Sequence, residues 1–118
     1  MGYVTIQTPP EVVAQILEML SNAKESGKIK KGVNETTKAI ERKTAQFVLI
    51  AGDVSPEEIV VHLPMICKEK GIPYAFVPTK KELGSAIGVE VGTSALAVEN
   101  PGSAKETMND ILKSKIHR

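Results

Sequence analysis

Four polar residues, Asn34, Glu35, Lys38 and Arg42, share one short segment of predicted helix. Asn34, Lys38 and Arg42 recur every four residues, so a helix places them on one face. An amide donates and accepts hydrogen bonds, whereas a carboxylate only accepts them and repels phosphate. Glu35 is therefore better suited to the amino groups of base edges than to a backbone. The set fits an irregular RNA helix, because the regular A-form major groove is too narrow for side chains to read.

The segment that carries these residues is basic. Residues 24–43 hold seven Lys or Arg and three Glu, a net charge of +4, whereas the whole chain has a net charge of +1. Its natural phosphate contacts are Lys31, Lys38, Arg42 and Lys43. One interpretation is a local anionic partner, and the alternative is an ordinary solvated surface rich in lysine.

Apolar periodicity predicts the elements that must position this segment. Helices are expected over residues 9–23, 34–43, 56–70 and 80–86, and from Ala104 to about Lys115. Strands are expected around Ile29 and over residues 46–51, 74–77 and 94–98. Pro64 is expected to kink or split its helix. The alternation predicts an α/β fold, a three-layer α/β/α sandwich with a small mixed central sheet of about four strands, in one domain spanning residues 1–118.

The helix starts carry capping-box patterns, in which Ser or Thr at the N-cap is followed three residues later by Glu or Gln. Four boxes are expected, beginning at Thr8, Ser55, Thr79 and Ser103. The 34–43 helix has no such box, so its first-turn N–H groups are expected to be open to an anion. The alternative is that Asn34 simply serves as the N-cap residue.

Composition argues against several other classes of protein. Aromatic residues make up 3% of the chain with no Trp, which nearly excludes extensive base stacking. The single cysteine, Cys67, indicates a reducing compartment and excludes a Cys-based zinc site. The apolar runs fall short of the ~20 residues of a membrane span, and no signal peptide is visible. We expect a cytoplasmic protein without membrane association.

Catalytic chemistry has little support in the sequence. There is no phosphate-binding glycine motif, and no Ser–His–Asp or paired-carboxylate arrangement. Asp53 ends a predicted strand, so one alternative is a small α/β nucleotide-binding protein or enzyme that uses it; a turn role is the simpler interpretation. Cys67 is expected in the core and His62 as a surface or packing residue. We predict no catalytic residue, no metal and no cofactor.

Residues 32–43, GVNETTKAIERK, resemble the signature of the kink-turn RNA-binding family, which includes the archaeal large-subunit ribosomal protein L-seven-Ae. The similarity continues through residues 49–56, 62–64, 72–74 and 80–84 and ends in residues 88–92, so it spans roughly residues 8–115. The resemblance implies a non-enzymatic protein that stabilises a kinked RNA internal loop built on tandem sheared G·A pairs.

The resemblance also implies roles by position. Three side chains match those that read the guanines in the widened major groove, namely Asn34, Glu35 and Lys38. Lys31 and Arg42 match backbone contacts, and Gly32 allows a close approach. Ser55 departs from the acidic residue that relatives often carry, which leaves a contact from that side chain open.

A loop before the last strand completes the implied site. Val89, Glu90 and Val91 match the loop whose apolar tip holds an extruded nucleotide, and Ile59 and Lys80 match lesser contacts near it. Exposed apolar side chains at a glycine-flanked tip are unfavourable unless a partner covers them. The alternative is that the valines point into the core.

The implied partners are kink-turn RNAs. They comprise 23S ribosomal RNA, the box C/D and H/ACA guide RNAs and, as a further association, ribonuclease P RNA. In guide particles the implied protein partners are the scaffold protein and the modification enzyme. The free protein is expected to be a monomer.

Overall fold

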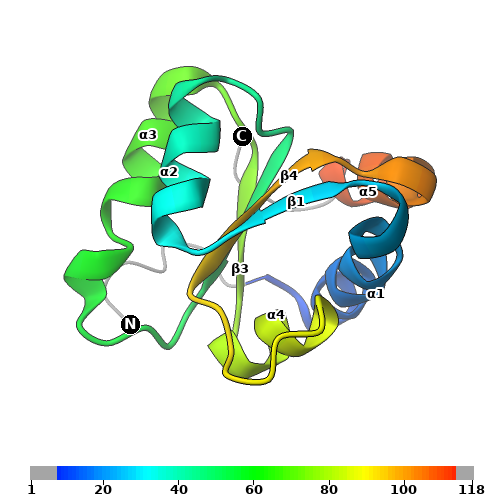
Figure 1. Ribbon diagram of the computed structural model, residues 1–118, viewed down its shortest axis with the longest axis horizontal. Coiled ribbons are helices and arrows are strands. Elements are labelled where there is room, and N and C mark those ends of the chain that lie inside the picture. The colour runs from blue at the N-terminus through cyan, green and yellow to red at the C-terminus, as the bar shows by residue number, and fades with distance from the viewer. Residues whose placement is uncertain (1–7, 114–118) are drawn as a thin grey trace.

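A four-stranded mixed sheet forms the centre of the protein in the computed structural model, which describes residues 8–113 (Figure 1). Its strands are β1 (Lys28–Lys31), β2 (Phe47–Ala51), β3 (Tyr74–Val77) and β4 (Ala95–Asn100). In space they follow the order β1-β4-β2-β3. β4 runs antiparallel to both β1 and β2, whereas β2 and β3 are parallel. The predicted small mixed sheet is confirmed.

Helices cover both faces of this sheet. They are α1 (Pro10–Ser26), α2 (Val33–Glu41), α3 (His62–Lys70), α4 (Lys80–Ala86) and α5 (Lys105–Leu112). α2 and α3 lie on one face, and α1, α4 and α5 lie on the other (Figure 1). The three-layer α/β/α sandwich is therefore confirmed, with element ends shifted by one or a few residues. Lys115, in the last predicted helix, lies outside the described residues.

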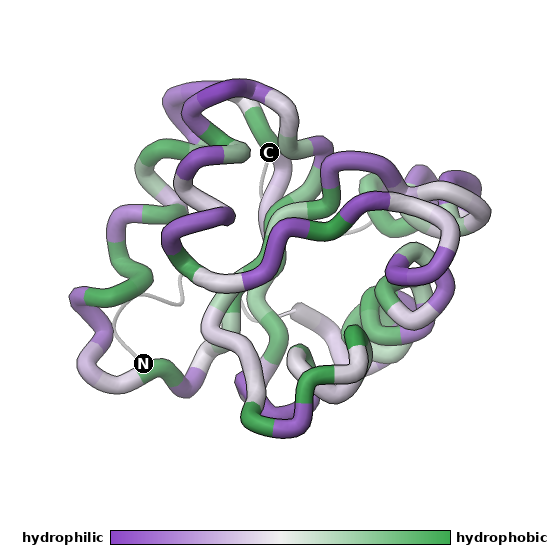
Figure 2. Tube along the Cα trace, in the orientation of Figure 1, coloured by the Kyte–Doolittle hydropathy of each residue, from purple (hydrophilic) through white to green (hydrophobic). Residues whose placement is uncertain are grey.

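The core is aliphatic and centred on β2 and β3, in which every residue is buried. Figure 2 shows apolar stretches along the central strands, and polar residues along α2 and β1. Ile16 of α1 and Ile40 of α2 are fully buried against the sheet from its two sides. Cys67 is also buried, as expected, and burial raises the pKa of its thiol to about 12. A thiol held protonated in this way is chemically inert.

Of the four expected capping boxes, only the one at Thr79 caps its helix, and only half of it forms: the Glu82 carboxylate accepts from the Thr79 hydroxyl at 3.1 Å and not from the Thr79 backbone N–H. Thr79 Oγ1 accepts a hydrogen bond from the backbone N–H of Glu82 at 3.1 Å. The boxes at Thr8, Ser55 and Ser103 are wrong, because the helices begin elsewhere. α1 has Pro9 as its N-cap residue, and a 3₁₀ turn (Gly102–Ala104) precedes α5.

The predicted 56–70 helix is split, as Pro64 suggested, but the break lies before the proline. A 3₁₀ turn, η1 (Glu57–Ile59), is followed by α3, whose N-cap residue is Val61. Pro64 sits in the first turn of α3, where backbone N–H groups have no intrahelical partner in any case. Its missing donor therefore does not disrupt the helix.

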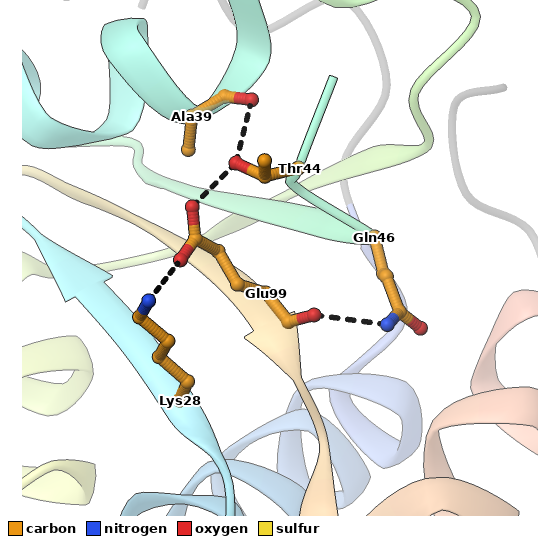
Figure 3. A network of polar contacts seen from close by, with 5 residues as sticks. All are labelled: Lys28, Ala39, Thr44, Gln46 and Glu99. Atoms are coloured by element: carbon orange, nitrogen blue, oxygen red, sulfur yellow. Dashed lines mark hydrogen bonds and ion pairs between the residues drawn. The ribbon is translucent and has the colours of Figure 1, made fainter. Parts of the chain in front are cut away.

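A polar network fastens the chain after α2 to the sheet (Figure 3). The Thr44 hydroxyl donates to the carboxylate of Glu99, and Lys28 Nζ lies 3.5 Å from the other carboxylate oxygen. Gln46 Nε2 donates to the Glu99 carbonyl at 2.9 Å. The Glu99 side chain is only 12% exposed. The pKa of its carboxyl is lowered, first by the Thr44 hydrogen bond and then by Lys28.

Candidate nucleic-acid interface

The predicted site residues come from separate stretches of chain that meet at one edge of the sheet. β1, β2 and β3 all end at this edge and β4 begins there, as the paired residues show: Lys31 with Leu96, Ile50 with Ala95, and Ala51 with Val77. The start of α2, residues 52–61, the start of α4 and the loop before β4 are consequently neighbours (Figure 1).

Backbone hydrogen bonds fix two of these neighbours in place. The Gly32 N–H, directly before α2, donates to the carbonyl of Ala95 at 2.9 Å. The Thr93 N–H, at the end of the loop, donates to the carbonyl of Lys80 at 2.9 Å. The first bond fixes the start of α2 to the first residue of β4, and the second joins the end of the loop to the start of α4.

The first turn of α2 begins on glycine. Gly32 is the N-cap residue with φ of 96° and makes no side-chain cap, and a Cβ there would meet nothing within 4 Å. Its carbonyl accepts hydrogen bonds from the Thr36 N–H at 2.9 Å and from Thr36 Oγ1 at 2.7 Å. The expected open turn is confirmed, and Asn34 as the N-cap is wrong because it is the second helical residue.

The open start is not peculiar to α2, contrary to the sequence argument. α1, α3 and α5 also begin without a side-chain cap. What distinguishes α2 is the unobstructed glycine, whose positive φ other residues rarely adopt. This leaves the backbone before the helix approachable by a ligand.

The polar side chains of α2 are presented to solvent. Asn34 is exposed, and within residues 8–113 its amide makes no intramolecular hydrogen bond. Lys38 Nζ lies 3.4 Å from a Glu35 carboxylate oxygen, with the two side chains 54% and 46% exposed. Lys31 and Arg42 are exposed at either end of the helix. The helix and its C-cap residue Arg42 therefore offer an amide, a carboxylate and two cations on one accessible surface, and Lys31 lies just before the start of the helix.

A partly buried hydrogen bond between side chains joins α2 to α3. The Thr37 hydroxyl donates to the Val33 carbonyl at 2.8 Å and lies 3.0 Å from His62 Nε2. Because the single hydroxyl proton goes to Val33, the imidazole N–H of His62 is the donor in the second bond. His62 therefore has the packing role expected of it.

The loop before β4 is held against α4 by glycines. A Cβ on Gly84 would lie 2.6 Å from Gly92 Cα, so the two segments make direct backbone contact. Gly92 itself has φ of 85°. At the tip, Val91 is 88% exposed, Glu90 is exposed and Val89 is half-buried. The alternative that the valines point into the core is wrong for Val91.

Two further predicted residues flank this loop. Lys80 is exposed at the start of α4, and Ile59 in η1 is 44% exposed. Asp53 Oδ1 accepts a hydrogen bond from the Lys80 backbone N–H at 2.8 Å. This bond gives Asp53 a structural role in joining the segment after β2 to α4. No contact in the described part of the chain favours Asp53 as a nucleotide ligand.

Sequence reasoning did not single out three further exposed residues, Val61, Met65 and Lys24. Val61 is the N-cap residue of α3 and is 44% exposed, and Met65 within α3 is 70% exposed. Lys24 Nζ lies 3.7 Å from the position that a Cβ on Gly88 would occupy, although the two residues are far apart in sequence. No local pattern could have indicated the Lys24 contact.

Residues 8–113 contain no group of three or more His, Cys, Asp or Glu side chains placed to hold a metal ion. None of their helices is both long enough and apolar enough to cross a membrane.

Comparison with known proteins agrees with this architecture. The structure is similar to the solved 15.5kD RNA binding protein of Giardia lamblia, with a TM-score of 0.85 and 30% sequence identity over 96% of this chain and 94% of that one. Residues 14–108 match the family model for the ribosomal protein L7Ae/L30e/S12e/Gadd45 family. That match covers all four strands and most of the helical residues, and the chain therefore belongs to the ribosomal protein L7Ae/L30e/S12e/Gadd45 family.

Proposed function

We propose that this chain is a non-enzymatic RNA-binding protein that recognises kink-turns. The observation that carries the proposal is that the solvent-accessible side chains of Asn34, Glu35 and Lys38 and the exposed Val91 belong to segments that meet at one edge of the sheet. The chain belongs to a family named for ribosomal proteins, and its structure is similar to that of an RNA binding protein. Both findings support RNA as the ligand.

The α2 residues read the tandem G·A pairs of the kinked loop in this proposal. The Glu35 carboxylate accepts hydrogen bonds from guanine amino groups, and the unoccupied Asn34 amide both donates and accepts. Lys38 pairs with Glu35 in the free protein and contacts the RNA in the complex. Lys31 and Arg42 contact phosphates, which position the protein without reading sequence. Gly32 lets the RNA come close to the backbone.

The loop of residues 87–92 holds the nucleotide that the kink extrudes. Val89 and Val91 contact its base, with Glu90 between them and with Ile59 and Lys80 at the margin. Covering Val91 removes an apolar side chain from water, which favours the bound state by about 1–2 kcal/mol. The contact is open only to an unstacked nucleotide, so it selects the kinked conformation.

The mechanism is a population shift. Free RNA samples open and kinked states, and the protein binds the kinked state alone. Binding therefore stabilises the kink by as much as the two states differ in affinity. No covalent step is required, which agrees with the proposal that the chain is not an enzyme.

The wider proposal concerns particles. We infer that residues 1–118 act as a single kink-turn RNA-binding domain, monomeric when free and cytoplasmic. Its RNAs are 23S ribosomal RNA, the box C/D and H/ACA guide RNAs and ribonuclease P RNA. In guide particles the protein–RNA surface recruits the scaffold protein and the modification enzyme. The resemblance of residues 32–43 and 88–92 to the archaeal ribosomal member supports this assignment.

The test is a titration of two RNA duplexes at several salt concentrations. One carries a kink-turn, and the other has its G·A pairs replaced by Watson–Crick pairs. The kink-turn duplex is expected to bind at least about a hundredfold more tightly, since each lost base contact costs about 1–3 kcal/mol. Equal affinity for the two duplexes at every salt concentration would refute the proposal.

A second readout separates bending from binding. Fluorophores at the two ends of the kink-turn duplex report the distance between them. Protein should bring the ends together with the same concentration dependence as binding. Binding without this approach would mean that the RNA is recognised in its open form.

A further inference from the structure

Lys24 lies at the far side of the loop from α2. It is in the last turn of α1, which packs beside α4 (Figure 1). Its Nζ is 3.7 Å from the position that a Cβ on Gly88 would take, so the ammonium group sits directly over the loop backbone. The Lys24 side chain thus reaches a residue that lies 64 positions later in the sequence.

The ammonium group has no anionic partner among residues 8–113. The ion pairs there join Lys28 to Glu99 and Lys38 to Glu35, and neither involves Lys24. Lys24 is exposed, and Gly88 beneath it is an exposed residue without a side chain. The charge is therefore free to meet an external anion at the loop.

A second cation flanks the same stretch of surface. Side chains alternate between the faces of a strand, and Lys30 of β1 is paired with Ala97, two residues from Glu99. The Glu99 side chain lies on the α2 side of the sheet, where it meets Thr44 (Figure 3). Lys31 is therefore on the opposite face, and α1 covers that face (Figure 1). Lys31 and Lys24 both lie on the α1 side of the interface, one near the start of α2 and the other over the loop.

We propose that Lys24 binds a phosphate of the nucleotide that lies on the loop of residues 87–92. This inference rests on the proposed function, because it takes that loop as the seat of the extruded nucleotide. A nucleotide whose base covers Val91 carries a phosphate on each side, and Lys24 is the cation that stands over the beginning of the loop. The lysine acts as a point charge and reads no base.

The first test compares Lys24→Gln with Lys68→Gln. Both lysines are exposed and lie in the last turn of a helix, so both substitutions remove the same favourable interaction with a helix C-terminus. Lys68 is in α3, which lies on the other face of the sheet from α1 (Figure 1). Lys24→Gln should weaken binding to the kink-turn duplex about tenfold and lower its salt slope by about one, whereas Lys68→Gln should change neither. Lys24→Arg should retain most of the affinity.

The second test places the contact on the RNA. Each phosphate flanking the extruded nucleotide is replaced in turn by a neutral methylphosphonate. At one of these positions the replacement should weaken binding of the wild-type protein about tenfold and have little further effect on Lys24→Gln. Independent, additive losses at every position would overturn the proposal.

The outcomes separate the two proposals. If Lys24→Gln binds like wild type with an unchanged salt slope, while the protein still rejects the duplex without G·A pairs, the Lys24 contact is wrong and kink-turn recognition stands. If wild-type protein does not distinguish the two duplexes, both proposals fail together. A thermal melt of each variant shows whether it is folded.

Discussion

The carboxylate of Glu35 and the ammonium group of Lys38 lie 3.4 Å apart, and both side chains remain about half exposed. An exposed pair of this kind contributes roughly 0–1 kcal/mol to folding, because water already stabilises both charges. The Asn34 amide makes no bond within the described residues. These groups can therefore be given to a ligand without loss of stability.

This separation of binding from folding predicts the behaviour of two variants. Asn34→Ala and Glu35→Ala should each weaken kink-turn binding by about 1–3 kcal/mol, because each removes a contact to a base edge. Their free energies of unfolding should stay within about 0.5 kcal/mol of wild type. The measurements are a binding titration and a urea melt on the same preparations.

The matched control for these variants is Glu41→Ala. Glu41 is an exposed carboxylate at the other end of α2, so it has the same charge and the same helix. Its removal should leave affinity unchanged or slightly higher, since RNA is negatively charged. A Glu35→Ala protein that binds as well as Glu41→Ala would contradict the role given to Glu35.

Residues of α2 were predictable because their spacing is local. A helix of known register fixes where Asn34, Lys38 and Arg42 point, and the sequence alone places them on one face. The position of Lys24 was not predictable, because it depends on how closely α1 approaches the loop after α4. Contacts like that of Lys24 arise from tertiary packing, and no characteristic spacing in the sequence reveals them.

Among elements, the helix starts show where local patterns fail. Ser103 has the spacing of a capping box, yet its N–H donates to Ser26 Oγ at 2.9 Å across the α1 end. The tertiary contact wins, and the chain there forms a 3₁₀ turn before α5 begins. Within residues 8–113 the Thr79 hydroxyl bonds only to Glu82, and it caps α4. Capping patterns thus predict that a helix begins nearby, and packing decides at which residue.

The Thr79 cap predicts how two substitutions change the stability of the protein. Thr79→Ala should destabilise the protein by about 1 kcal/mol, because the Glu82 N–H loses its acceptor. Ser55→Ala, at a box that does not form, should cost less than about 0.5 kcal/mol. The comparison is made by chemical unfolding of both variants. Equal destabilisation would mean that the Thr79 hydroxyl does not cap α4.

For the whole molecule, the strand order brings the interface together. The sequence predicted the strands, but no local pattern predicts that β4 inserts between β1 and β2. That insertion sets the first residue of β4 against Gly32, and so brings the end of the loop that precedes β4 to the start of α2. The resemblance therefore predicted which residues belong to the candidate site. The strand order of the sheet explains why they lie at one edge.

The opposite edge of the sheet depends on Glu99, and this dependence should vary with pH. The pKa of its carboxyl is lowered in the folded protein, chiefly by the Thr44 hydroxyl and then by Lys28. A lowered folded pKa means that the charged form contributes stability above the unfolded pKa of about 4.3. This contribution is lost as the pH falls through the folded pKa, which lies lower still.

Glu99→Gln should therefore cost about 1 kcal/mol of unfolding free energy at pH 7, and the difference from wild type should shrink below about pH 4. Urea melts across this pH range measure it. Glu18→Gln is the control, because Glu18 is exposed in the middle of α1 and has no ion pair within residues 8–113. Since Glu99 lies at the edge of the sheet opposite the interface, its variant should bind RNA normally while folded. If the difference in unfolding free energy between wild type and Glu99→Gln stays the same at low pH, the charge of Glu99 does not stabilise this edge of the sheet.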